Sequence, residues 1–272
     1  MSMISVIVTT YNWDAALEAC IRSLFAQQDL KFEIIIADDG SKKPTTDLIK
    51  QLSLESPVVL KHCYHEDKGF RAGTIRNKAV ALSSGDYLIF IDGDCIVFPY
   101  FIKRHRHFAT HGYFVAGNRV LLNPAFTDHV LKNKLALHQQ SRLKFIKWRL
   151  QGYINRLLPF IYVPFDFFRL RHPQRWQKAM ACNLALWKAD FMNVNGFDQL
   201  FEGWGYEDSD LVIRLIHLGV KRKEGRFALP VLHLWHFQND RNSEDENYQR
   251  LMTRLNNPQF IWAEKGLITE AS

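Results

Sequence analysis

Four aspartates in the first hundred residues have the type and spacing to bind a divalent cation and a nucleotide. Asp38 and Asp39 are adjacent, and Asp92 and Asp94 flank Gly93. Carboxylates repel a diphosphate, but they accept hydrogen bonds from a base or ribose, and they hold Mg²⁺ or Mn²⁺, which binds phosphate. The glycine lets a ligand approach the backbone closely. An Asp-x-Asp triplet also arises by chance, and Asp-Gly is a common turn, so its position in the fold decides between the two interpretations.

Cations follow the third apolar run of the sequence. Lys68, Arg71 and Arg76 lie there, and Gly69 and Gly73 allow a tight chain path between them. One interpretation is contact with a diphosphate, whose negative charge grows as it leaves. The other is ordinary surface charge or helix capping.

Two histidines near the end of the chain, His233 and His236, are candidate metal ligands. Residues three apart on a regular strand point to opposite faces, so both could bind one ion only if the chain bends there. The alternative is a pair of ordinary core histidines. Imidazole ligands would favour Mn²⁺ over Mg²⁺.

The spacing of apolar residues predicts how these side chains are positioned. Strands are expected at 4–9, 32–37, 58–63 and 87–91, and helices at 14–27, 44–54 and 72–82. This is the spacing of βαβ units in a parallel sheet with helices on both faces. Each polar motif follows a strand, so the motifs should meet at one sheet edge, where open α/β folds bind ligands.

The remaining elements are less regular. Further helices are expected at 100–110, in the segment after it (two helices), up to Leu218 and at 245–255, with β-type runs at 180–187 and 231–237. No Gly-x-Gly-x-x-Gly follows the first strand and no P-loop occurs, which disfavours dinucleotide oxidoreductases and P-loop phosphotransferases.

The net charge of +7 is concentrated in one segment. Between His138 and Lys178 there are nine Lys/Arg and nine aromatic residues but one acid, Asp166. The segment is either a solvated helical face or a surface for anionic headgroups or an anionic glycolipid. No recognition motif accompanies the charge, so nucleic acid is not expected.

The cysteines and the N-terminal residues indicate the cellular compartment. Cys20, Cys63, Cys95 and Cys182 are far apart and form no CxxC pair, which is typical of reduced thiols. The chain starts with a short β-type run rather than a secretory signal, and it has no stretch of about 20 apolar residues. We therefore expect a cytoplasmic protein, with the inner face of the membrane as a second location.

Several of these motifs resemble a known family. VIVTTYN, ADDGS, GFRAGTIRN and IDGD, in this order and spacing, are similar to the nucleotide-binding half of family 2 glycosyltransferases. ACNLALWKADFMNVNGFDQLFEGWGYEDSDLVIRL resembles the galactosyltransferase C-terminal region of animal β-1,4-galactosyltransferases and bacterial chondroitin-type polymerases. The resemblance covers about residues 3–100 and 179–240. It implies a GT-A fold, a Rossmann-like α/β fold whose mostly parallel sheet is flanked by helices.

The resemblance also implies roles on the nucleotide side. The residues expected at the uridine are Thr9, Tyr11, Asn12 and Asp39. Arg71 would lie near the diphosphate, together with Lys68 and Arg76 if they are not surface charges, and Asp92 and Gly93 near the ribose. Asp94 would bind Mn²⁺ (or Mg²⁺), and the related galactosyltransferases place a soft ligand and then a histidine at the spacing of His233 and His236.

On the acceptor side, the resemblance makes Asp208 the general base. Inverting transfer needs one such carboxylate opposite the leaving group. The alternative is helix capping, because acids are favoured in a first helical turn. Trp204 and Glu207 would line the sugar and acceptor pockets. Tyr206 replaces the usual second glycine, so it would narrow the sugar pocket or stack on the acceptor, and galactose specificity does not carry over.

We therefore expect an inverting, metal-dependent transferase that uses a UDP-sugar and acts on a glycan or glycolipid of a bacterial surface polysaccharide or lipopolysaccharide. Its parts would be a nucleotide-sugar-binding half (1–120), a basic-aromatic helical insert (121–178) and an acceptor-side catalytic half (179–272). The alternatives are a metal-dependent nuclease or phosphodiesterase, which would use paired carboxylates and the basic segment, and a non-catalytic nucleotide-sugar binder.

Overall fold

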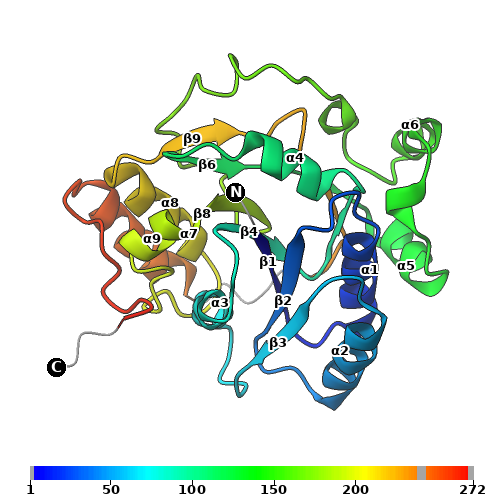
Figure 1. The fold of residues 1–272 in the computed structure, drawn as a ribbon, viewed down its shortest axis with the longest axis horizontal. Helices are drawn as coiled ribbons and strands as arrows, with labels where there is room; N and C mark the ends of the chain where they lie inside the picture. Colours follow the sequence, from blue (N-terminus) through cyan, green and yellow to red (C-terminus); the bar gives the residue numbers. More distant parts are fainter. Residues whose placement is uncertain (1–2, 238–242, 269–272) are drawn as a thin grey trace.

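The computed structural model describes residues 3–237 and 243–268 (Figure 1). Its first half is the expected parallel βαβ arrangement. The strands are β1 (Ile4–Thr10), β2 (Phe32–Asp38), β3 (Leu60–Tyr64) and β4 (Tyr87–Asp92), and the connecting helices are α1 (Asp14–Phe25), α2 (Lys43–Glu55) and α3 (Ala72–Ala81). Thr10 pairs with Asp38, and Thr9 pairs with Asp92. The carboxyl ends of β1, β2 and β4 therefore share one edge.

Three later strands extend the sheet beyond β4. They are β6 (Tyr113–Ala116), β8 (Asn183–Trp187) and β9 (Lys221–Glu224), and the strand order is β3-β2-β1-β4-β8-β6-β9. β8 runs antiparallel to β4 and β6, whereas the other neighbours in this sheet are parallel. The mostly parallel α/β fold expected from the sequence is confirmed.

A small second sheet brings the end of the chain to the Asp-Gly-Asp turn. It consists of β5 (Cys95–Val97), β7 (Asn118–Leu121) and β10 (Pro230–His233), in the order β5-β10-β7. In the antiparallel pairing of β10 with β5, His233 lies opposite Cys95.

The segment after residue 110 contains the two helices expected there, followed by an irregular stretch. The remaining helices are α4 (Phe101–Phe108), α5 (Pro124–Lys132), α6 (Arg142–Leu150), α7 (Lys188–Asn193), α8 (Glu207–His217) and α9 (Glu244–Leu255), with single 3₁₀ turns at Leu137–Gln139 and Leu158–Phe160. Within 121–178, α5 and α6 are helical, but the half after α6 is irregular apart from the second turn. Gly152 and three prolines interrupt that half, and proline cannot continue a helix. No helix among the described residues is long and apolar enough to cross a membrane.

The main sheet is buried on both faces, as expected for parallel strands. Val6 and Val8 of β1 pack with Leu17 of α1 on one face, and Ile7 packs with Ile75 of α3 on the other. A third apolar cluster joins the small sheet to α5 and α6. These layers fix the edge at which the polar loops meet.

Candidate active site

The loops after β2 and β4 are both hydrogen-bonded to the end of β1. The backbone N–H of Asp39 donates to Thr10 O (3.0 Å), and that of Gly93 donates to Thr9 O (2.7 Å). A Cβ atom at position 93 would lie 3.1 Å from Thr9 O, so glycine permits this close approach. Asp39 and Gly93 are thereby held on the two sides of β1.

Two aspartate–histidine pairs lie behind the first acidic loop. Asp39 Oδ1 is 2.5 Å from His65 Nε2, and its Oδ2 accepts from the backbone N–H of Arg71 (2.9 Å). Asp38 Oδ2 is 2.9 Å from His62 Nε2. Neither histidine was predicted as a site residue from the sequence. Their signal was the run HCYH at the end of β3, which the parallel pairing of β2 with β3 sets beside the two aspartates.

Tyr11 presents a half-exposed ring at this edge. Its hydroxyl donates to Asp67 Oδ2 (2.8 Å), which raises the pKa of the phenol. Asn12 has a positive φ of 47°, and its side-chain oxygen accepts from the backbone N–H of Lys42 (2.8 Å). The turn after β1 is thus fixed to the loop after β2, with the aromatic ring on the outside.

Arg76 joins the two halves of the chain. The buried guanidinium donates from Nε to Thr9 Oγ1 (2.9 Å), from Nη2 to Asp92 Oδ1 (3.0 Å) and from Nη1 to Glu207 Oε1 (3.1 Å). Burial by itself lowers the pKa of Arg76, but the two carboxylates outweigh it and the pKa is raised. Each guanidinium nitrogen is thus used by a protein oxygen, from β1, β4 or α8.

Asp94 faces both candidate histidine ligands. Its Oδ2 is 3.3 Å from His236 Nε2 and 3.7 Å from His233 Nε2. The Nδ1 atoms of the two rings contact backbone carbonyls, Phe237 O at 2.7 Å and Leu234 O at 2.8 Å. A carbonyl only accepts, so each Nδ1 carries a proton, and Nε2, the ring nitrogen that faces Asp94, is the one that could bind a metal ion. Metal-binding histidines commonly have this arrangement.

The end of β10 explains how both histidines reach one carboxylate. The strand stops at His233, and the N–H of Leu234 then donates to Asp94 O (3.0 Å). The ligand atoms of Asp94, Cys95 and His233 lie within 4.8 Å of one another. Burial raises the pKa of Asp94, against the opposing effect of His233. A buried carboxylate beside imidazole nitrogens and a thiol fits a divalent cation, and Cys95 is a further candidate donor that no sequence motif indicates.

Asp208 lies in the first turn of α8. Its Oδ2 accepts from the N–H of Ala181 (3.2 Å), and its Oδ1 is 3.3 Å from Ser209 Oγ. Burial raises the pKa of Asp208, and Arg76 opposes that effect. Burial and the adjacent Asp208 raise the pKa of Glu207 to about 7, although Arg76 acts in the opposite direction. Both carboxyl groups therefore titrate above the usual range.

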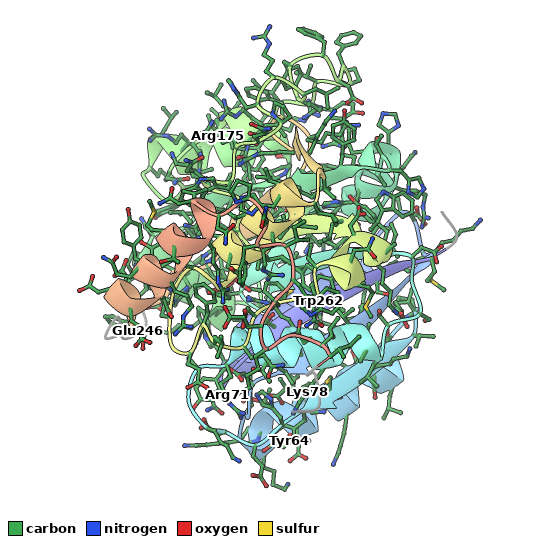
Figure 2. All side chains as sticks on the ribbon, turned by 90° about the vertical axis from the view of Figure 1, so that its left-hand side faces the viewer. Tyr64, Arg71, Lys78, Arg175, Glu246 and Trp262 are labelled. Carbon is green, nitrogen blue, oxygen red and sulfur yellow. The ribbon has the colours of Figure 1, made fainter. Side chains whose placement is uncertain are left out.

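The other predicted residues lie around this edge. The Tyr206 backbone is left-handed (φ 69°), and its ring centroid lies 5.5 Å from that of Tyr248 on α9. Trp204 is half-buried in the same turn, and Lys68 is exposed. The Arg71 side chain donates to Glu66 O (2.5 Å). Figure 2 shows Arg71 near the lower end of the face that carries α9.

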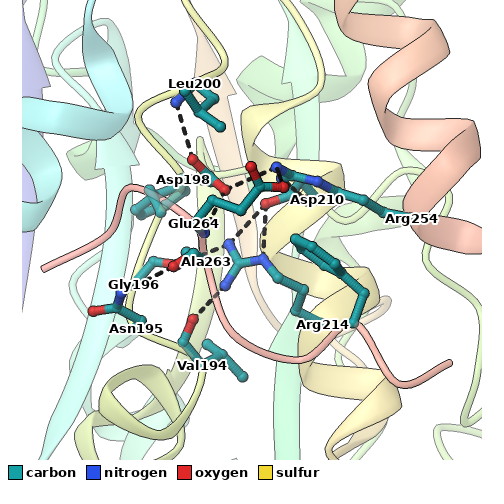
Figure 3. Close-up of polar contacts among 12 residues, drawn as sticks. Val194, Asn195, Gly196, Asp198, Leu200, Asp210, Arg214, Arg254, Ala263 and Glu264 are labelled. Atoms are coloured by element: carbon teal, nitrogen blue, oxygen red, sulfur yellow. Dashed lines mark hydrogen bonds and ion pairs between the residues drawn. The ribbon is translucent and has the colours of Figure 1, made fainter. Parts of the chain in front are cut away.

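Asp210 has a different environment from Asp208. It is fully buried, its Oδ1 accepts from Arg254 Nη1 (2.7 Å), and its Oδ2 accepts from Arg214 Nε (2.9 Å) (Figure 3). Arg254 also pairs with Asp198 (2.9 Å). This network ties α8 to α9 and to the chain before α8, so Asp210 holds the helix that carries Asp208.

Two family models match most of the chain. The model described as "Glycosyl transferase family 2" matches residues 5–165, and the one described as "N-terminal domain of galactosyltransferase" matches residues 165–236. Validoxylamine A glucosyltransferase of Streptomyces hygroscopicus subsp. limoneus is 31% identical over 229 residues, 80% of this chain and 49% of the relative. Hyaluronan synthase of Pasteurella multocida is 27% identical over 238 residues, 79% and 23% of the two chains. The chain thus spans about half the length of the first relative.

Solved structures share the fold. S. aureus TarS 1–349 in complex with UDP has a TM-score of 0.63 at 14% identity, with 94% of this chain and 65% of that chain covered. The mannosyltransferase PcManGT from Pyrobaculum calidifontis, in complex with GDP-Man and Mn²⁺, has a TM-score of 0.54 at 15% identity, covering 85% and 56%.

Proposed function

Since the chain belongs to glycosyl transferase family 2, we propose that it transfers a sugar from a UDP-sugar to a hydroxyl group of a glycan or glycolipid, with inversion at the anomeric carbon. The observation that carries the proposal is the Arg76 link. One guanidinium contacts Asp92 at the end of the nucleotide-binding half and Glu207, the neighbour of Asp208. The proposed donor site and the proposed base therefore share one edge of the fold.

In this proposal Asp208 removes the proton of the acceptor hydroxyl as its oxygen attacks the anomeric carbon opposite the leaving group. A single displacement of this kind inverts the configuration. The raised pKa of Asp208 suits the role, because a base is most effective when its pKa approaches the working pH. The Ala181 N–H on the other carboxylate oxygen would fix the orientation of the base.

Asp94, His233 and His236 would hold Mn²⁺ or Mg²⁺, with Cys95 as a neighbouring donor. When bound, the ion neutralises the diphosphate as it leaves. The imidazole donors favour Mn²⁺. Burial of Asp94 keeps its charge away from water and so strengthens its attraction for a cation.

The remaining residues would bind the two substrates. The proposed uridine and ribose contacts are Thr9, Tyr11, Asn12, Asp39, Asp92 and Gly93. Lys68 and Arg71 are the proposed diphosphate contacts, whereas Arg76 would act by holding Asp92 and Glu207 in place. Trp204, Tyr206 and Glu207 would line the sugar and acceptor pockets.

The proposed organisation is that of two halves, 1–120 and 179–272, with an insert at 121–178 that faces the acceptor side. The proposed location is the cytoplasm or the inner face of the membrane. Among the described residues, the compact group with metal-ligand spacing contains one carboxylate. A two-metal phosphodiesterase would need paired carboxylates, so no nuclease is proposed.

A donor screen tests this function. Thermal unfolding would be measured with UDP-, GDP- and TDP-sugars, each with and without Mn²⁺, because a ligand that binds the folded state raises Tm. We expect a UDP-sugar with Mn²⁺ to give the largest rise and slow release of UDP. Nuclease activity with Mg²⁺ and no effect of any UDP-sugar would contradict the proposal.

A further inference from the structure

Helix α6 has apolar residues on two opposite faces. Phe145 and Trp148 point inward and are buried in the cluster below the small sheet. Leu143, Ile146 and Leu150 point outward and are 77%, 45% and 84% exposed. Their spacing of i, i+3 and i+7 makes them one stripe along the helix. A helix that is apolar on both sides normally has both sides covered, and the protein itself covers one.

Basic residues border this outer stripe on both sides. Successive residues are about 100° apart around an α-helix, so Lys144 and Lys147 lie on one side of the stripe and Arg142 and Arg149 on the other. All four are exposed, and none forms an ion pair with an acid of the described residues.

The one acid of the segment does not offset this charge. Asp166 lies 2.6 Å from Lys223 Nζ and 3.6 Å from Arg169 Nε, so it is already paired. The exposed surface of α6 is therefore basic and apolar together.

The chain after α6 carries further exposed apolar side chains. Figure 1 shows it running from α6 along one edge of the molecule to β9. Four of its large apolar side chains are more than half exposed, namely Leu158, Ile161, Phe165 and Phe167. The buried Arg169 holds this stretch in place by donating to Glu224 O (2.9 Å) and Val163 O (2.5 Å). The backbone that carries these apolar side chains is thus held by hydrogen bonds to Arg169.

We propose that the outer face of α6, together with residues 158–167, docks onto an anionic lipid bilayer. The apolar stripe would enter the headgroup–acyl boundary, and the flanking lysines and arginines would reach the lipid phosphates, as in interfacial amphipathic helices. A nucleic acid would satisfy the charges but leave Leu143, Ile146 and Leu150 in water. The lipid surface covers both kinds of side chain.

The docking surface lies one layer away from the candidate metal site. Phe145 and Trp148, on the inner face of α6, share a cluster with Leu232 and Leu234, which flank His233. Docking onto the bilayer does not depend on the proposed function. The purpose of docking, which would be to bring a lipid-linked acceptor to Asp208, does rest on the proposed function.

Vesicle flotation tests the proposal with the whole chain. The probes are vesicles of phosphatidylglycerol mixed with phosphatidylcholine, and vesicles of phosphatidylcholine alone, at low and high salt. The protein should float with the anionic vesicles at low salt and bind the neutral ones far less. Each Lys or Arg near such a surface contributes about fivefold in affinity. The charge variant should therefore bind about 100-fold more weakly; it combines Lys144→Gln, Lys147→Gln and Arg149→Gln.

Two further variants test whether binding to vesicles depends on the apolar stripe of α6 or on the overall hydrophobicity of the protein surface. The stripe variant combines Leu143→Gln, Ile146→Gln and Leu150→Gln and should lose most binding. The matched control changes exposed residues elsewhere and should bind like the wild type; it combines Leu30→Gln, Leu54→Gln and Val59→Gln. All changes are at exposed side chains, so far-UV circular dichroism and UDP-sugar hydrolysis in solution should be unaffected. Equal binding to neutral vesicles, wild-type binding by the stripe variant, or retention by duplex RNA without vesicle binding would overturn the proposal.

Discussion

The Nη1 atom of Arg76 lies 3.1 Å from the Oε1 atom of Glu207, in a buried ion pair between residues 131 positions apart. The same guanidinium contacts Asp92 through Nη2 and Thr9 through Nε. One side chain of α3 thus connects the ends of β1 and β4 with the start of α8. The position of Asp208 relative to the nucleotide-binding half depends on this contact.

Replacement of Arg76 by methionine should destabilise the protein by about 3 to 5 kcal/mol, because it leaves the buried Glu207 and the partly buried Asp92 without their cation. Urea unfolding followed by circular dichroism would measure this. The double variant with Glu207→Gln should recover part of the loss, since it removes one of the unpaired charges. Additive effects of the two changes would show that the pair is not energetically coupled.

Replacement of Asp208 by asparagine should lower the transfer rate about 10²- to 10⁴-fold, the contribution typical of a general base, and leave UDP affinity unchanged. The amide oxygen can still accept from the Ala181 N–H, so the fold should tolerate the change. Steady-state transfer and UDP titration calorimetry would measure the two properties. Asp245→Asn makes the same change at an exposed position on α9; it is the control and should retain activity.

The same carboxylate predicts the pH dependence of transfer. Burial raises the pKa of Asp208 above 3.8. A base acts only when it is ionised, so the rate should fall on the acidic side at a pH above that of an ordinary aspartate. A pH–rate profile that stays flat down to pH about 4 would speak against Asp208 as the base.

Removal of a candidate metal ligand should weaken Mn²⁺ binding. Asp94→Asn and His236→Ala should each reduce affinity at least about tenfold, because losing even an outer-shell partner typically costs that much. The free Mn²⁺ signal in electron paramagnetic resonance measures binding without any substrate. His129→Ala, at an exposed position on α5, should bind Mn²⁺ like the wild type. Unchanged affinity in both ligand variants would place the ion elsewhere.

The first half of the fold could be predicted because its strands are apolar, buried on both faces and regularly spaced. The expected ends of β1, β2 and β4 differ by one residue from those observed. β9 could not be predicted, because its sequence is KRKE. Arg222 and Lys223 are nevertheless buried there, and Arg222 donates to carbonyls of residues 175 and 177. Only tertiary contacts make that stretch a strand.

The candidate site, like the fold, could be predicted from the sequence only in part. Asp94 and His236 could be suggested from residue type and spacing, although their roles remain predictions. The inward direction of Arg76 could not be predicted, since its partner Glu207 is far away in sequence. The pairing of His65 with Asp39 likewise required the register of β2 and β3, which no sequence pattern specifies.

Tyr206→Gly tests whether the ring at this position affects the donor-sugar pocket. Glycine would relieve a left-handed backbone (φ 69°), a gain of about 1 kcal/mol, but it would lose the ring contact with Tyr248, a loss of similar size. We therefore expect little change in stability. If the ring narrows the pocket, the variant should accept a wider range of UDP-sugars, as measured by UDP release. An unchanged donor preference would show that the Tyr206 ring does not select the donor sugar.

Acid stability should depend on Glu33, a buried carboxylate of β2. Burial by itself raises the pKa of Glu33, but hydrogen bonds from Lys61, Ser5 and Ser84 outweigh it and lower the pKa to about 2. Because the folded state holds this group ionised more strongly than the unfolded chain, its contribution is complete above pH 4.5 and is lost as the pH falls to about 2. The difference between the two pKa values corresponds to about 3 kcal/mol.

Glu33→Gln should therefore destabilise the protein at pH 7 and remove this part of the acid dependence, as measured by urea unfolding at several pH values. Glu202→Gln, at an exposed position, should leave the pH dependence as in the wild type, and a parallel shift of both variants would rule out this origin of the acid sensitivity.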